Sequence, residues 1–245
     1  MAERIVPPAL LRRLELENGL TLVQIPFSPF AIPIRLMLEA AGAPHAIRDL
    51  EAWDRRLVVD LTGGSYYPVP VVVDATRSPA VVVYESRDDQ IEIARYVDAK
   101  YRLGLFAEEY QGLLELVVGY IEGQVEDVGF RLNDIYLLPA IPDVAGRGMA
   151  IRHKERKFGK GCLDEWRRQA PQLQARLMEL LTPLDQMLDR HPFLLGERIS
   201  YADYSLAGVL GDYTYTGDNE VPRSLTNLCR WYEALPSVTL PLASP

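Results

Sequence analysis

The stretch that decides the fold runs from Leu20 to Pro44 and reads LTLVQIPFSPFAIPIRLMLEAAGAP. Its first eight residues are rich in apolar and β-branched side chains and predict a strand. Ser28 and Pro29 follow, and serine is a favoured helix N-cap while proline suits the first helical position. Apolar side chains then recur at helical spacing until Gly42. The segment therefore predicts a strand, a turn and a helix, with Ser28 at the junction.

The flanking sequence continues this alternation. Residues 1–19 contain two prolines and a short charged stretch, and we expect them to form an arm. Ser86 and Asp89 have capping-box spacing and predict the start of another helix. We further expect a short strand, a weakly helical stretch and a hairpin of two strands, at residues 46–50, 51–61, 69–74 and 80–84.

From Glu108 onward the apolar spacing is helical. We expect a loop from Asp134 to Gly148, because the stretch DIYLLPAIPDVAGRG contains proline and glycine. Pro183 is expected to kink or break a long leucine-rich helix. Ser200 and Asp203 form a second capping box. The change in composition near residues 102–108 marks the expected domain boundary.

Composition excludes several classes of protein. The 245 residues are 48% hydrophobic and 24% charged, which are ordinary globular proportions. The formal net charge of -8 argues against a protein that binds nucleic-acid phosphates. The two cysteines form neither a disulfide framework nor a metal-ligand pattern. We see no signal sequence or membrane span, so we expect a cytoplasmic protein with no metal and no membrane or nucleic-acid partner.

Three short motifs carry a resemblance to a known protein family. The first is SPFA, from Ser28 to Ala31, followed by Ile34-Arg35. The second is Val69-Pro70-Val71, followed after a hairpin by Glu85-Ser86. The third reads FLLGERISYAD and ends at Asp203. In this order and spacing the motifs resemble the glutathione transferase family, from about residue 20 to residue 235.

The resemblance implies a fold of two parts: a thioredoxin-like α/β domain followed by an all-helical bundle. We therefore expect a glutathione-binding domain at residues 1–102 and a substrate-pocket domain at residues 108–245. In the family, the pocket for the electrophile lies between the domains, and most members are homodimers. The expected function is a glutathione transferase with glutathione as co-substrate, a hydrophobic electrophilic small molecule as substrate, and a homodimeric state.

The resemblance also assigns roles to particular residues. Ser28 would hold the glutathione sulfur. Val69 would offer its backbone N–H and C=O to the cysteinyl part, which requires a cis peptide bond at Pro70. Glu85 would receive the γ-glutamyl ammonium, and Ser86 at a helix N-terminus the carboxylate. The expected glutathione-binding residues are thus Phe30, Val69, Pro70, Glu85 and Ser86.

The physical requirement on Ser28 follows from thiol chemistry. A free thiol has a pKa of about 8.5, and the thiolate is the nucleophile. Each unit by which an enzyme lowers that pKa needs about 1.4 kcal/mol of preference for the anion. A hydroxyl that donates to sulfur at the positive end of a helix supplies this preference. No cysteine precedes Cys162, which excludes thiol–disulfide exchange at this turn.

The spacing after the Glu85-Ser86 step departs from the family pattern. A helical tyrosine usually follows the step by six residues, whereas Tyr96 lies ten residues after Ser86. Counting back from Tyr96 places Asp89-Gln90 in the glutathione-binding position. Counting forward from Pro70 places Glu85-Ser86 there, and we favour this alignment.

The remaining predictions concern the surroundings of the site and the exact reaction. Arg35 is expected to tune the charge near Ser28, and three tyrosines, Tyr120, Tyr213 and Tyr215, to line the substrate pocket. The stretch from Arg152 to Cys162 loosely resembles a bacterial branch with aryl-ether-cleaving (β-etherase-like) transferases. The competing functions are a non-catalytic binding or interaction module on the same fold and a glutathione-dependent isomerase.

Overall fold

The computed structural model describes residues 3–86 and 91–240. The chain separates into two compact units, Met1–Phe106 with Ser237–Pro245, and Ala107–Pro236. The first unit is a mixed sheet with helices, and the second is entirely helical in its described secondary structure. The two-part fold class expected from the sequence is therefore confirmed, while the domain limits 1–102 and 108–245 stay a prediction.

The first unit is built on a five-stranded sheet with the strand order β1-β5-β4-β2-β3. β2 and β3 are parallel, and the other neighbouring strands are antiparallel. The strands are short, and their expected positions are confirmed for all but the first. They are β1 (Glu3–Ile5), β2 (Leu20–Gln24), β3 (Ala46–Asp49), β4 (Val71–Asp74) and β5 (Val81–Val83).

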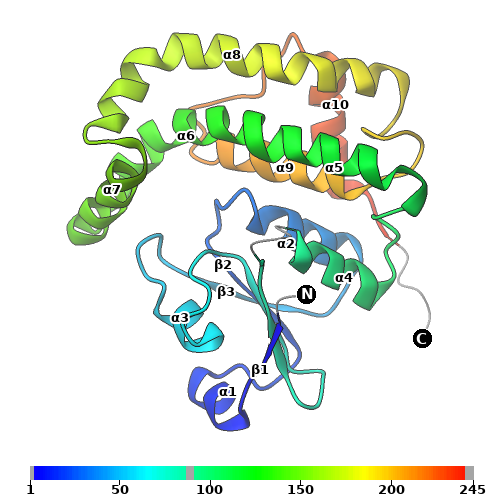
Figure 1. The fold of residues 1–245 in the computed structure, drawn as a ribbon. Helices are drawn as coiled ribbons and strands as arrows, with labels where there is room; N and C mark the ends of the chain where they lie inside the picture. Colours follow the sequence, from blue (N-terminus) through cyan, green and yellow to red (C-terminus); the bar gives the residue numbers. More distant parts are fainter. Residues whose placement is uncertain (1–2, 87–90, 241–245) are drawn as a thin grey trace. The chain divides into compact units, whose positions relative to one another are not determined.

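Successive side chains of each strand point to opposite faces of this sheet, and each face packs against different helices. On one face, Val23 and Val73 join the core that includes side chains of α1 and α3. On the other face, Asp74 accepts a hydrogen bond from Tyr96 of α4. Figure 1 shows α2 and α4 together on that face and α3 on the opposite one. The helices of this unit are α1 (Pro8–Leu14), α2 (Ala31–Ala40), α3 (Arg56–Thr62) and α4 (Glu92–Tyr101).

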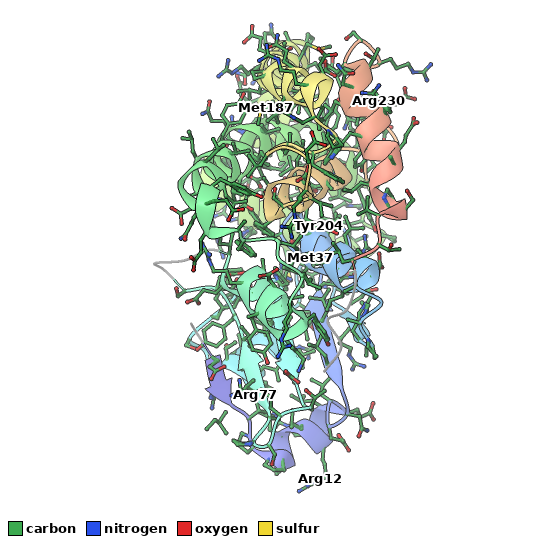
Figure 2. All side chains as sticks on the ribbon, turned by 90° about the vertical axis from the view of Figure 1, so that its right-hand side faces the viewer. Arg12, Met37, Arg77, Met187, Tyr204 and Arg230 are labelled. Atoms are coloured by element: carbon green, nitrogen blue, oxygen red, sulfur yellow. The ribbon has the colours of Figure 1, made fainter. Side chains whose placement is uncertain are left out.

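The prediction of an arm at residues 1–19 is wrong. β1 pairs with the edge of the sheet, with Ile5 opposite Val81. Val6 and Leu11, which lies on α1, are buried in the core that also includes side chains of α3. Arg12 on α1, by contrast, is exposed (Figure 2). The few apolar residues of this segment bury enough surface to order it, and β1 covers an otherwise open strand edge.

The second unit is a bundle around the buried helix α9 (Tyr201–Tyr213). Every residue of α9 except Gly211 is buried, and Tyr204 lies in the interior (Figure 2). α5 (Gln111–Tyr120), the π-helix η2 (Ile121–Val125) and α6 (Glu126–Ala140) follow one another without a break. The other elements are η1 (Glu108–Tyr110), α7 (Val144–Phe158), α8 (Cys162–Arg190), α10 (Thr226–Ala234) and η3 (Leu235–Ser237).

One prediction about this unit is wrong, and another is excluded in one of its two alternatives. The expected loop from Asp134 to Gly148 is almost entirely helical, since α6 continues through Pro139 and α7 starts at Val144. Pro139 has no N–H to bond the carbonyl of Ile135 four residues earlier. The Arg167 guanidinium donates to that carbonyl instead, at 3.5 Å. α8 runs on past Pro183 to Arg190, which excludes the break, while the kink at Pro183 stays a prediction.

Over the described residues, the helices are too short or too polar for any of them to cross a bilayer.

Candidate functional site at one end of the sheet

The strand register gathers the expected site residues at one end of the sheet. β2 and β4 are antiparallel, with Val23 opposite Val71. β4 and β5 are also antiparallel, with Val72 opposite Val83. The carboxyl ends of β2, β3 and β5 therefore meet the amino end of β4. This end carries the turn with Ser28, the Val69-Pro70 step, the Glu85-Ser86 step and the loop that follows β3.

Ser28 lies buried in the turn between β2 and α2. Its backbone N–H donates to the Ile25 carbonyl at 2.9 Å, and its carbonyl accepts from Ala31 and Ile32, both at 3.0 Å. The prediction that Ser28 caps the helix is wrong, because Phe30 holds the N-cap position. Among the described residues, the Ser28 hydroxyl makes no hydrogen bond, so the turn positions the residue through its backbone alone.

The neighbouring predicted residues occupy distinct positions around this turn. Phe30 is 36% exposed at the start of α2. Val69 is buried and precedes the first residue of β4 by two positions. The Val69-Pro70 peptide bond is cis, as the resemblance implied. The Arg35 side chain runs along α2 toward Glu39, with Nε 3.9 Å from Oε1.

The Glu85-Ser86 step differs from its expected form. α4 begins at Glu92 with Ile91 as its N-cap, so the prediction that Ser86 caps this helix is wrong. The Glu85 side chain reaches the helix instead, and its carboxylate accepts hydrogen bonds from the Glu92 N–H at 2.6 Å and the Ile93 N–H at 3.3 Å. The alternative pair Asp89-Gln90 lies outside the described residues.

Arg55 is a candidate residue that the sequence analysis missed. Its Nη1 donates to the carbonyls of Glu51 and Asp54 at 3.1 and 3.2 Å, and its guanidinium carbon lies 5.8 Å from the centre of the Tyr67 ring. The adjacent Asp54 carboxylate accepts two hydrogen bonds from the Arg56 side chain through Nε. Arg55 therefore keeps a positive charge at this end of the sheet. Its partly buried position is set by the loop after β3, which no sequence pattern specifies.

The capping box at the start of α9 is confirmed. The Asp203 carboxylate accepts from the backbone N–H of Ser200 at 2.9 Å and of Leu194 at 3.0 Å. It also accepts from the Ser200 hydroxyl at 3.0 Å. These bonds satisfy amides at a buried helix start, so the pair has a structural role.

Comparison with known proteins gives a match for the second half of the helical unit. Residues 164–234 match the family model described as "Glutathione S-transferase, C-terminal domain". This stretch of the chain is therefore similar to the C-terminal domain of glutathione S-transferases. The resemblance seen in the sequence is thereby confirmed, whereas the β-etherase-like branch stays a prediction. No curated protein sequence matches the chain.

Solved structures show that the glutathione S-transferase fold extends over both units. Glutathione transferase GSTFuA3 from Phanerochaete chrysosporium aligns at 17% identity over 91% of this chain and 98% of its own, with a TM-score of 0.74. The glutathione S-transferase CsGST63524 of Ceriporiopsis subvermispora, in complex with glutathione, aligns at 18% identity over 93% and 99%, with a TM-score of 0.72. Glutaredoxin 2 from Salmonella typhimurium, also in complex with glutathione, aligns at 17% identity over 91% and 97%, with a TM-score of 0.68.

The three tyrosines expected to line a substrate pocket have different environments in the helical unit. The Tyr120 hydroxyl donates to the Leu180 carbonyl of α8 at 2.7 Å. Tyr213 is buried at the end of α9, and Tyr215, two residues later, is 47% exposed. Of the three, Tyr215 therefore offers the largest exposed surface to a ligand. A pocket role for all three stays a prediction.

Two carboxyl groups on the long helix were also missed. Glu122 lies in the π-helix η2 and accepts from the hydroxyls of Ser205 at 2.9 Å and Tyr201 at 3.5 Å. Burial raises the pKa of Glu122 to about 7, and it raises the pKa of Glu126, one turn later, to about 7 as well. Carboxyl groups that titrate near neutrality are common at functional sites, and π-helical turns are also enriched there.

In the described part of the chain, no three His, Cys, Asp or Glu side chains are grouped in a way that could hold a metal ion.

Proposed function

We propose that this protein is a glutathione transferase that activates the glutathione thiol for attack on a hydrophobic electrophile. The observation that supports this most is the register of β2, β4 and β5, which gathers Ser28, Val69 and Glu85 at one end of the sheet. Residues separated by more than 50 positions in the sequence are thus available to one ligand.

Ser28 is proposed to donate its hydroxyl hydrogen to the glutathione sulfur. Within the described chain this hydroxyl has no competing hydrogen bond, and it lies near the amino end of α2, where anions are favoured. A hydrogen bond to an ionised sulfur contributes about 1.5–3 kcal/mol, which corresponds to a thiol pKa lowered by about one to two units.

The other contacts would align the tripeptide along the same end of the sheet. The backbone of Val69 pairs with the cysteinyl part as an added strand does. The Glu85-Ser86 step and the start of α4 receive the γ-glutamyl end. The carboxylate beside Arg55, that of Asp54, is bound by Arg56, so the Arg55 guanidinium is suited to the glycyl carboxylate. Phe30, exposed at the helix start, would cover the bound sulfur.

A direct experiment combines binding and turnover. Retention on immobilised glutathione is measured first, followed by turnover of a chromogenic aryl halide by wild type, Ser28→Ala and Ser78→Ala. Ser78 is exposed in the hairpin at the opposite end of the sheet and serves as the matched control. We expect at least a tenfold loss of turnover for Ser28→Ala and none for Ser78→Ala. Equal turnover in all three proteins would exclude the proposed role of Ser28.

A non-catalytic binding module is the second candidate, and a specific observation favours it. Glu85 already occupies amides at the start of α4, where the γ-glutamyl end of glutathione would bind. If the protein ignores glutathione at millimolar concentration, this second function replaces the first. An isomerase with the same thiolate differs only in substrate, and a product assay with a cis-diketo acid separates it from a transferase.

We also propose a cytoplasmic homodimer, which follows from the family resemblance. Sedimentation velocity of the purified protein gives the oligomeric state directly. A hydrophobic electrophile is proposed for the helical unit because Tyr215 exposes an aromatic ring. Turnover of aryl ethers against aryl halides tests the β-etherase-like branch.

A further inference from the structure

The helix α7 and the residues directly after it concentrate positive charge in an acidic protein. Residues 144–160 contain six Lys or Arg residues and one acidic residue, Glu155, whereas the whole chain has 26 Lys and Arg against 34 Asp and Glu. Within the helical unit α7 contacts α6 and α8, and Figure 1 shows it at one edge of the bundle. A basic surface element is thus set against a protein that is otherwise strongly acidic.

Most of these charges lie on the outer side of α7. Lys154 and Arg147 are engaged by α6 and the residue after it. The other four basic residues are exposed: Arg152, Arg156, Lys157 and Lys160. Within the described chain the last three form no ion pair, and Arg152 reaches only Glu155, at 3.3 Å. The exposed positive charge is therefore left largely uncompensated by this protein itself.

The amino-terminal end of the same exposed side is apolar. Val144 is 71% exposed and Met149 is 57% exposed. Met149, Arg152 and Arg156 are spaced by three and four residues, so they follow one another along one side of the helix. We call the surface formed by Val144, Met149, Arg152 and Arg156 the α7 face. It changes from apolar to basic along the helix axis.

Helix stability accounts for only part of this pattern. Arg156 and Lys157 lie in the last turn of α7, where basic side chains interact favourably with the helix dipole. The dipole gives no reason for Arg152, one turn earlier. It also gives no reason for leaving Val144 and Met149 in water, where burial against a partner would be favourable.

The distribution of side chains along α7 favours a peptide segment over a bilayer or a nucleic acid. A helix that lies on a bilayer has apolar side chains along its whole length, whereas on the α7 face they are confined to one end. A bilayer or a duplex is also an extended array of negative charge, which the acidic remainder of the chain repels. α7 has 15 residues, and its length of about 22 Å is spanned by about seven residues of extended chain.

We propose that the α7 face binds an acidic segment of a partner protein, whose apolar side chains pack on Val144 and Met149 and whose carboxylates bind Arg152 and Arg156. A guanidinium binds a carboxylate through two parallel hydrogen bonds, and clusters of arginine recognise acidic motifs in this way. The flexible Met149 side chain adapts to the apolar part of such a segment. Glutathione takes no part in this contact, so the inference is independent of the proposed transferase activity.

The test measures fluorescence anisotropy of two labelled synthetic peptides with the full-length protein. One peptide has two leucines followed by four glutamates, and the other has the reverse order, so that both directions along α7 are sampled. The same peptides with glutamine in place of glutamate are the charge controls. Vesicles of phosphatidylserine and phosphatidylcholine are tested in parallel by sedimentation, because an anionic lipid surface is the competing class of partner.

Two double variants remove the same charge from different helices. Arg152→Gln/Arg156→Gln changes the α7 face, and Arg12→Gln/Arg13→Gln is the matched control on α1. All four arginines are exposed, and each pair contains one residue with a surface ion pair, Arg152 on α7 and Arg13 on α1. Met149→Gln tests the apolar end, and circular dichroism establishes that every variant is folded.

We expect at least one glutamate peptide to bind wild type, with an affinity that falls as salt is added. Arg152→Gln/Arg156→Gln should weaken this binding at least tenfold and Met149→Gln at least threefold, while Arg12→Gln/Arg13→Gln and wild type bind alike. The inference is overturned if neither glutamate peptide binds at millimolar concentration, or if either variant of the α7 face retains wild-type affinity. Binding to vesicles without binding to the peptides also overturns it and assigns the face to a lipid surface.

Discussion

The partly exposed Lys154 of α7 forms an ion pair with the buried Asp134 of α6, with Nζ 2.6 Å from Oδ2. Lys154 Nζ also lies 4.4 Å from the centre of the Phe130 ring. α7 buries only Gly146 and Ala150 fully, and its last residue, Phe158, packs against the rings of Phe130 and Trp166. The ion pair and this aromatic cluster together attach α7 to the bundle.

Replacing Lys154 by Met is expected to destabilise the helical unit by about 3 kcal/mol, because the Asp134 carboxylate is left buried without its counterion. The measurement is urea unfolding followed by circular dichroism. Arg152→Met is the matched control on the same helix, since Arg152 is exposed and its pair with Glu155 is worth about 0–1 kcal/mol. Equal losses in the two variants would contradict this account of α7.

Stability is expected to fall as the pH rises from about 5 to about 8. The pKa of Glu122 is raised from 4.5 to about 7 by burial. Between these two values the folded state holds a proton that the unfolded state has released, so raising the pH favours unfolding. We expect about 1–3 kcal/mol of stability to be lost across this interval from Glu122 alone.

Glu122→Gln tests this pH dependence, because the amide imitates the protonated acid at every pH. Chemical unfolding at pH 5.5 and pH 8 is compared for wild type, Glu122→Gln and the exposed control Glu115→Gln. We expect the variant to lose less stability between the two pH values, while the control follows wild type. Identical pH profiles for all three proteins would show that Glu122 is ionised in the folded state throughout.

The sequence predicted most of the fold because its periodic segments are consistent with their surroundings. The strand from Leu20, the hairpin strands and the capping box at Ser200 all have local signals that tertiary packing supports. β1 was missed because three residues carry no period and are ordered only by pairing with β5. α6 was missed in its second half because Arg167, distant in sequence, satisfies the carbonyl that Pro139 leaves unbonded.

The candidate site was predictable only in part. Ser28 and Val69 are marked by short motifs, and the sheet register brings these segments to one end. The contact between Glu85 and the start of α4 was not predictable, since it joins residues seven and eight positions apart across a segment with irregular spacing. Arg55 is indistinguishable from Arg56 in the sequence, and only the loop geometry separates the two.

Arg55→Met is expected to weaken glutathione binding about tenfold, because a charge-assisted hydrogen bond contributes about 1.5–3 kcal/mol. Arg56→Met is the matched control: Arg56 is adjacent in sequence, but its side chain binds the Asp54 carboxylate. The dissociation constants of both variants are measured by calorimetry. Similar affinities would show that the glycyl carboxylate does not contact Arg55.

Ser200→Ala is expected to lower the stability of the helical unit by about 1–2 kcal/mol, because it removes the hydroxyl from the α9 capping box. Thermal unfolding of this variant is compared with that of the exposed control Ser224→Ala. Turnover at a temperature where both variants are folded should equal that of wild type. A loss of turnover without a loss of stability would give Ser200 a role beyond the cap.

The measurement that tests the central claim most directly is the titration of the glutathione thiol while it is bound. Ultraviolet absorbance of the thiolate is recorded against pH with wild type, Ser28→Ala and Ser78→Ala, each saturated with glutathione. The account predicts that wild type and Ser78→Ala lower the thiol pKa by at least one unit from about 8.5, and that Ser28→Ala abolishes this shift. A bound thiol that ionises in wild type at the same pH as in buffer would contradict the account.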